Sequence, residues 1–203
     1  MTMNCSPPFT RRRFLLTAVL MSGAALPARL ARAATGPEKY VQGIAKDVLA
    51  LANSGVRGGP LQSRFVSLLQ RHSDIRSIAM FSLGNYQKEF PSALRGKYYD
   101  LVVRYTAGLF TYYIEDFAGS GFDIKSSKPQ GKAIIVDSSI RYEGGTSSPV
   151  KWRVVNVGSG FRVNDVNVRG IWLSLQMRDK FTSVLKQNKG NFEALLDYLR
   201  KNA

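Results

Sequence analysis

Apolar side chains recur every three or four positions along much of the chain, a spacing that is typical of amphipathic helices. The longest run of this kind covers residues 96–117 and is unusually rich in aromatic residues. Its stripe includes Tyr98, Leu101 and Tyr105 at steps of three and four. With Ser92 as its N-cap, the run predicts one helix about 40 Å long, at a rise of about 1.5 Å per residue. Such a wide apolar stripe serves either a protein core or an apolar ligand.

Shorter runs with the same period predict further helices on both sides of this one. They cover residues 37–52, 61–71, 74–83 and 171–187, and a last helix follows its cap residue Asn191. Ser73 would cap the third helix, and Leu175 would point inward from the fifth. After Gly121 the pattern changes to Val and Ile in partial alternation with polar residues, which is typical of strands. The four expected strands cover residues 122–127, 132–142, 150–157 and 161–168.

Turn-like segments join neighbouring strands, so we expect them to pair antiparallel. The order of elements is helices, then a meander of strands, then helices. This order predicts an α+β fold of one domain, with helices on one face of an antiparallel sheet.

The first 33 residues have the pattern of an export signal. Three arginines at residues 11–13 precede an apolar stretch over residues 15–26, and an A-x-A cleavage site ends at Ala33. The apolar stretch is shorter than the ~20 residues that a membrane-spanning helix needs. We therefore expect cleavage after Ala33 and a mature domain of residues 34–203 in the periplasm. The paired arginines resemble a twin-arginine signal, and the choice between that route and general secretion stays open.

The chain is strongly basic, with 29 Lys and Arg against 14 Asp and Glu and a formal net charge of +15. Loss of the five arginines in the signal would leave 24 basic and 14 acidic residues, or +10. The charges are scattered and the chain is exported, so we expect no nucleic acid partner. A solvated basic surface and attraction to anionic membranes both remain open. The one cysteine, Cys5, lies in the signal, so the mature domain depends on its core for stability.

Candidate catalytic residues are few. The one histidine, His72, stands beside Ser73 and Asp74, but catalytic triads are assembled in space, and a helix-end position favours a structural role. Asp165 lies in an otherwise apolar strand, where it could cap a backbone group, meet an arginine or act in catalysis. No residues have metal-ligand spacing, and no phosphate-loop motif follows the glycine-rich stretch. The sequence therefore favours binding over catalysis and predicts no cofactor and no metal.

Two stretches of the chain resemble the MlaC family of periplasmic phospholipid carriers, also called toluene-tolerance auxiliary proteins. Residues 74–119 resemble that family's short helix, Leu-Gly pair and long aromatic helix. Residues 160–200 resemble its strand ending in Asp-Val, its glycine and its leucine-rich last helix. The chain departs from the family where Phe161 replaces a tryptophan and where Ile171 and Trp172 replace Val and Ser. These departures leave open whether the lipid is a phospholipid or a hopanoid.

The resemblance implies a curved four-stranded antiparallel sheet that encloses a deep apolar cavity with the helices. It implies a monomeric carrier, not an enzyme, which shuttles phospholipid between an outer-membrane lipoprotein complex and an inner-membrane ABC transporter with its substrate-binding ring protein.

Candidate contacts for the acyl chains and for the headgroup follow from this reading. The acyl-chain candidates are Phe65, Leu69, Ile78, Phe81, Tyr98, Leu101, Val102, Tyr105, Leu109, Ile134, Val136, Val154 and Val163. The candidates for contact with a headgroup or a partner protein are Lys97, Arg104, Lys132, Lys151 and Arg153. An ordinary place in the core or on the surface is the alternative for each residue.

Two other functions stay open on the sequence. The chain could be an enzyme on a cone-shaped fold related to nuclear-transport-factor domains, with His72 and Asp74, or Asp165, as its acid and base. It could also be an exported interaction module without a ligand. A carrier requires more apolar wall than folding does, because each methylene removed from water contributes about 0.8 kcal/mol.

Overall fold

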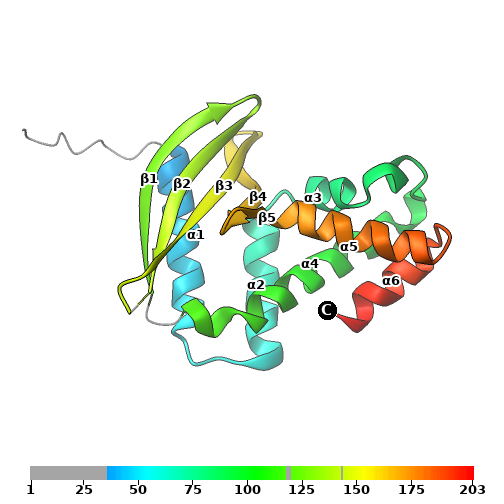
Figure 1. Cartoon of the computed structure of the whole chain (residues 1–203), viewed down its shortest axis with the longest axis horizontal. Helices are drawn as coiled ribbons and strands as arrows, with labels where there is room; N and C mark the ends of the chain where they lie inside the picture. Colours follow the sequence, from blue (N-terminus) through cyan, green and yellow to red (C-terminus); the bar gives the residue numbers. More distant parts are fainter. Residues whose placement is uncertain (1–35, 118–119, 143) are drawn as a thin grey trace, which may run out of the picture. The chain divides into compact units, whose positions relative to one another are not determined.

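The computed structural model of the protein describes residues 36–117, 120–142 and 144–203. The predicted export signal and its cleavage site lie outside these ranges. Within them the chain forms six α-helices and five strands (Figure 1). The helices are α1 (Gly36–Ala52), α2 (Gly58–His72), α3 (Ile75–Ser82), α4 (Arg95–Tyr112), α5 (Leu173–Gln187) and α6 (Phe192–Lys201). The strands are β1 (Gly121–Gln130), β2 (Ala133–Arg141), β3 (Ser147–Val157), β4 (Gly160–Val168) and β5 (Ile171–Trp172). Short 3-10 helices are η1 (Gly84–Lys88), η2 (Ser92–Leu94) and η3 (Ile114–Phe117).

The strands form one antiparallel sheet in the order β1-β2-β3-β4-β5. The predicted α+β class is confirmed, but the sheet has five strands instead of four. The extra strand, β5, pairs with Asn167 and Val168 across a tight turn. In this turn Arg169 and Gly170 have positive φ, and the Asn167 side-chain oxygen accepts a hydrogen bond from the Gly170 amide (3.1 Å). A two-residue strand that runs straight into a helix has no alternation of its own, so the sequence pattern assigns it to the helix.

The long aromatic helix is shorter than predicted. α4 covers 18 residues, or about 27 Å, and 3-10 turns take up the residues on either side. Ser92 begins η2, so it is not the N-cap of α4. At the other end the Tyr113 amide bonds to the Phe110 carbonyl (3.2 Å), three residues back, and the chain tightens. This turn brings Ile114 into the apolar cluster that α1, α2 and α4 share.

Smaller differences concern single helix positions. α2 begins three residues before its predicted start. Asp74 caps α3 in place of Ser73, because its carboxylate accepts a hydrogen bond from the Ser77 amide (3.3 Å). Leu175 does not point into the core, since it is 44% exposed. The predicted cap of α6 is confirmed, because the Asn191 side chain accepts a hydrogen bond from the Glu193 amide (3.0 Å).

The helices meet the sheet in two places. α1 lies along β1 and β2, and α2, α3 and α5 reach β4 (Figure 1). α4 and α6 pack chiefly on other helices. The α1–sheet cluster, which joins α1 to the strands, has three buried residues, Val41, Val136 and Val154. The first helix is attached to the sheet by this cluster, by half-buried residues around it, and by a hydrogen bond from the Ser127 hydroxyl to the Glu38 carboxylate (2.7 Å).

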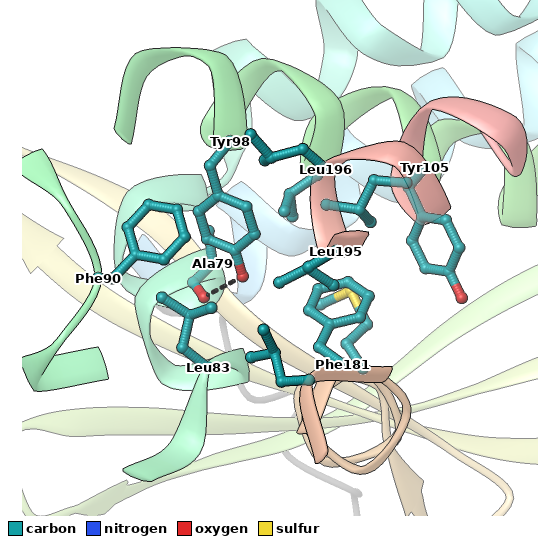
Figure 2. Close-up of a cluster of buried hydrophobic side chains, with 12 residues drawn as sticks. Ala79, Leu83, Phe90, Tyr98, Tyr105, Phe181, Leu195 and Leu196 are labelled. Carbon is teal, nitrogen blue, oxygen red and sulfur yellow. Dashed lines mark hydrogen bonds between the residues drawn. The ribbon is translucent and has the colours of Figure 1, made fainter. Parts of the chain in front are cut away.

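The largest apolar cluster is the bundle core, formed by twelve buried residues that come mainly from α3, α4, α5 and α6 (Figure 2). Tyr98 is fully buried there, and its hydroxyl donates a hydrogen bond to the Ala79 carbonyl (2.8 Å). Phe90 and Phe181 pack against the Tyr98 ring, with centroid distances of 4.8 and 6.5 Å. Burial raises the pKa of Tyr98, so its hydroxyl stays protonated and remains a donor.

Removal of the Tyr98 hydroxyl tests this packing. In Tyr98→Phe the Ala79 carbonyl loses a buried donor, and we expect the free energy of unfolding to fall by about 1–2 kcal/mol. Tyr112, which is 80% exposed at the end of α4, supplies the control. Tyr112→Phe should change the same quantity by less than about 0.5 kcal/mol. Urea denaturation followed by circular dichroism measures both, and equal losses would contradict the burial of Tyr98.

Candidate functional site

An apolar cavity of about 100 Å³ lies between α1, α2, the sheet and the helix bundle. α1 contributes Ile44 and Val48, which lie one turn apart, and Leu49 beside them. α2 contributes Phe65 and Leu69, one turn apart. Both helices thus turn an apolar stripe toward the same space.

The opposite wall is the inner face of the sheet. Phe122 of β1 pairs with Ile140 of β2, and Trp152 of β3 pairs with Val166 of β4, so side chains from four strands form a continuous surface. The Trp152 indole nitrogen donates a hydrogen bond to the Ser138 hydroxyl (3.0 Å). The indole N–H is therefore satisfied within the sheet, and the ring presents apolar surface to the cavity.

The third side is closed by the helix bundle. Ile78 of α3, Phe110 of α4 and Met177 of α5 line it. Thr106 also lines it, but its hydroxyl donates to the Val102 carbonyl of the same helix (2.7 Å). Of the 25 lining residues, 20 are apolar, so the cavity suits a ligand that is mostly hydrocarbon.

Asp165 is the one carboxylate among the described residues that line the cavity. It is 3% exposed, and its oxygens accept hydrogen bonds from the Ser174 amide (3.0 Å) and the Ser174 hydroxyl (2.5 Å). The Arg153 guanidinium donates a further bond (3.2 Å) and lies 4.2 Å from the centre of the Trp172 ring. The N-cap residue of α5 makes no cap bond of its own, so Asp165 caps this helix from the neighbouring strand. Both structural roles expected of Asp165 are confirmed, and they occupy its oxygens.

His72 is the other titratable side chain in the lining. The Tyr40 hydroxyl donates to the His72 carbonyl (3.1 Å) and lies 3.3 Å from His72 Nδ1. The second ring nitrogen, Nε2, is buried and has no hydrogen-bond partner among the described residues. Burial, together with the charge of Arg71, lowers the pKa of His72, while Asp47 opposes this shift. The ring is therefore neutral at pH 7.

Four of the residues that the sequence assigned to acyl chains line the cavity, namely Phe65, Leu69, Ile78 and Val163. The other nine lie elsewhere. Tyr98, Val102, Tyr105, Leu101 and Leu109 belong to the bundle core or pack against it, and Ile134, Val136 and Val154 lie in or against the α1–sheet cluster. Phe81 is 41% exposed on α3, with the Arg178 guanidinium 5.3 Å from its ring centre. Contact with a lipid stays a prediction for all thirteen.

The five predicted headgroup or partner contacts lie outside the lining. Lys151 and Arg153 flank Trp152 on β3, where Lys151 pairs with Asp137 (3.7 Å) and Arg153 with Asp165 (3.2 Å). Lys97 pairs with Glu193 of α6 (3.6 Å). Arg104 and Lys132 are exposed on α4 and in the β1–β2 turn. The structure does not bring these cations together at one place.

Comparison with known proteins decides the family. A protein-family model described as MlaC protein matches residues 45–201. The chain belongs to the MlaC family. No curated protein matches it. Among solved structures, the phospholipid-binding protein from Ralstonia solanacearum, in complex with a phospholipid, is similar with a TM-score of 0.69 and 16% identity, over 83% of this chain and 97% of that one. At this identity the likeness shows the fold.

Two further observations concern the described residues of this MlaC family member. No helix in the described ranges has the length and apolar character needed to cross a bilayer. Nor do three His, Cys, Asp or Glu side chains of the described residues gather where they could hold a metal.

Sequence reasoning missed much of the lining. It did not select α1, the inner strand residues Phe122, Ile140 and Trp152, or Met177. Alternation along the strands places Phe122, Ile140 and Trp152 on one face of the sheet, so the sequence did contain a signal for these three residues. The alternation does not reveal which part of that face is covered by a helix. In the structure α1 covers Val136 and Val154, which the sequence had assigned to acyl chains.

Replacing Asp165 tests its role as cap and ion-pair partner. Asp165→Asn weakens the bonds to Arg153 and Ser174, and we expect the free energy of unfolding to fall by about 1–3 kcal/mol. Asp137, which pairs with Lys151 at 3.7 Å, is a matched strand aspartate, and its partner is 48% exposed. Asp137→Asn should cost less than about 1 kcal/mol. Chemical denaturation measures both, and an equal cost would mean that Asp165 has no special structural role.

The lowered pKa of His72 predicts how stability varies with pH. In the unfolded chain the histidine has its ordinary pKa of 6.5, whereas in the folded protein its pKa is lower. The contribution of neutral His72 to stability is therefore present above pH 6.5, and it is lost as the pH falls through the folded pKa. We expect His72→Phe to flatten this part of the profile of unfolding free energy against pH. NMR titration of the one histidine measures the folded pKa directly, and a midpoint at or above 6.5 would refute the prediction.

Proposed function

We propose that this protein carries phospholipid through the periplasm, with the acyl chains held in the cavity between the sheet and helices α1 and α2. The apolar lining of that cavity is the observation that carries the proposal. Membership in the MlaC family supports it. The similar Ralstonia solanacearum protein is a phospholipid-binding protein, which also supports it.

The energetics of an acyl chain explain why such a carrier needs an enclosed wall. Exposing a chain to water costs about 0.8 kcal/mol per methylene, so a chain of about sixteen carbons carries on the order of 12 kcal/mol. A carrier has to return most of this through contact with apolar side chains. The interaction is non-directional, so chain identity has little influence on affinity.

The cavity has to widen to accept such a ligand. Its volume of about 100 Å³ is below that of an engineered cavity of roughly 150 Å³ that accepts benzene. We infer that widening occurs between α1 and the sheet, because the α1–sheet cluster has three buried residues against twelve in the bundle core. Segments with few buried apolar contacts open at the lowest free energy.

Delivery between membranes completes the proposal. The carrier would exchange lipid with an outer-membrane lipoprotein complex and with an inner-membrane ABC transporter and its ring protein, as the resemblance to the family implies. Its basic surface suits acidic surfaces on such partners. The export signal predicted for residues 1–33 would place it in the periplasm.

An enzyme is the less supported alternative. The three side chains that the sequence offered as acid and base are engaged elsewhere: Asp74 caps α3, Asp165 caps α5, and His72 Nδ1 faces the Tyr40 hydroxyl. These contacts support binding and transport over catalysis.

Lipid analysis of the purified protein tests the function. We expect native mass spectrometry and extraction of protein from the cell envelope to find phospholipid at about one molecule per chain. A hopanoid in its place would change the cargo but not the carrier function. Protein that is folded, free of lipid and unable to take up lipid from vesicles would refute the proposal.

A matched pair of substitutions tests the cavity. Leu68 is half-buried and lines it, whereas Leu175 of α5 is 44% exposed and does not. Leu68→Glu places a carboxylate beside the acyl chains, and we expect lipid per folded chain to fall at least about tenfold because desolvating a charge is costly. Leu175→Glu should retain lipid. Circular dichroism establishes that both variants fold, and full lipid content in Leu68→Glu would contradict the assignment.

A further inference from the structure

The apolar wall of the cavity extends to one end of the sheet, where β3 begins and β4 ends. Val150 of β3 pairs with Val168 of β4, and both line the cavity. Val168 is the last residue of β4, and its partner in β5, Ile171, is 53% exposed. The wall therefore comes close to solvent at the β4–β5 turn.

Arg169 follows Val168 directly and stands at this end of the wall. Its Nε–H donates a hydrogen bond to the Ser148 hydroxyl (3.3 Å). Ser148 pairs with Ile140 of β2 and lies two residues before Val150, and residues in these two relations share one face of a sheet. Ile140 and Val150 line the cavity, so the Ser148 hydroxyl lies on the cavity face. The bond thus holds the Arg169 guanidinium beside the last apolar residues of the wall.

Most of this guanidinium remains free to bind a ligand. It has five N–H donors, and among the described residues its side-chain partner is the Ser148 hydroxyl. No carboxylate in the parts of the chain that the structure describes forms an ion pair with it. Two other arginines of the sheet, Arg141 and Arg153, are already paired with aspartates. Arg169 is therefore a positive charge without a protein counter-charge beside the cavity wall.

The conformation of the turn does not explain why an arginine stands there. Arg169 and Gly170 form a two-residue hairpin turn with φ values of 52° and 88°. Such turns favour Asn-Gly or Asp-Gly, and a left-handed backbone is unfavourable for a long side chain. Lys189, beyond the end of α5, has the same φ of 52°, so this conformation alone does not identify a site. The position of Arg169 beside the cavity does.

The chemistry of a guanidinium defines the ligand group that it fits. Its planar N–H groups bind the oxygens of phosphates and carboxylates through two parallel hydrogen bonds. A phospholipid that places an acyl chain in the cavity keeps its phosphate near the surface. We propose that Arg169 is an anion subsite at the β4–β5 end of the cavity and binds the phosphate of the lipid held there. The inference rests on the proposed function, and it adds a headgroup contact outside the five cations selected from the sequence.

The size of the contribution follows from the exposure of the arginine. Hydrogen bonds to charged groups are stronger than neutral ones, but an exposed ion pair is weakened by solvent and salt. We therefore expect the contact to change affinity about three- to tenfold. The effect should shrink as ionic strength rises, because salt screens exposed charges.

Binding of two matched lipids tests the subsite. The probes are lysophosphatidic acid and the monoacylglycerol with the same acyl chain, each displacing an uncharged fluorescent fatty-chain probe. We expect Arg169→Asn to lower the affinity ratio of the first lipid to the second about three- to tenfold. The affinity for monoacylglycerol should stay unchanged, because asparagine suits the turn and the cavity is intact.

Lys189→Asn is the matched control. It removes the same charge at the same φ, but beyond the far end of α5 and outside the cavity lining. We expect this variant to keep the affinity ratio of the wild type. An equal loss in both variants would show a general attraction of anionic lipids to a basic protein and would overturn the inference. An unchanged ratio in Arg169→Asn would overturn it as well.

Phosphorus NMR separates lipid phosphate from free phosphate. We expect the signal of bound lysophosphatidic acid to differ between the wild type and Arg169→Asn, and inorganic phosphate alone to give the same signal with both. A response of inorganic phosphate that is lost in Arg169→Asn would show an anion site independent of the cavity, and would overturn the assignment to a lipid. If neither lipid binds the wild type, the proposed carrier function fails too, whereas equal binding of both lipids refutes the subsite alone.

Discussion

Helices α3 and α5 are held to the sheet through β4, in part by polar bonds. The Asp74 amide donates to the Val163 carbonyl (2.8 Å), which fixes the segment between α2 and α3 to β4. Two residues further along the same strand, Asp165 holds the first turn of α5 through the Ser174 amide and hydroxyl. These bonds use backbone groups and one carboxylate. Much of the apolar inner face of the sheet therefore does not have to pack against the helices. That face remains available as the wall of a cavity.

The bundle core explains why the helices do not collapse onto this wall. α3, α4, α5 and α6 bury their large side chains against one another, with Tyr98, Phe181 and Leu195 all fully buried. Apolar side chains that are already closely packed gain little free energy by moving toward the sheet. The remaining sides of the space between the bundle and the sheet are closed by α1 and α2.

The separation between the bundle core and the cavity wall shows what the sequence could and could not predict. Periodicity identified the aromatic stripe of α4 and correctly marked Tyr98 and Val102 as inward-facing. It could not say that their neighbours would be α3, α5 and α6 instead of a ligand, because a period of 3.6 reveals a face and not its partner. The strand pattern gave the antiparallel meander, whereas the two-residue β5 and the 3-10 turns beside α4 depend on tertiary contacts. Asp165 stood out as a polar residue in an apolar strand, and it proved to be a structural anchor.

An unfilled cavity raises the free energy of the unloaded protein. At about 24 cal/mol per Å³, a cavity of about 100 Å³ costs roughly 2–3 kcal/mol, a substantial part of the 5–15 kcal/mol that stabilises a typical domain. A ligand that fills the space recovers this cost on binding. The Asp165 anchor and the bundle core allow the fold to tolerate the cost, because they hold the helices in place without closing the cavity. The proposed carrier must also release its cargo, and opening between α1 and the sheet would separate a cluster with three buried residues.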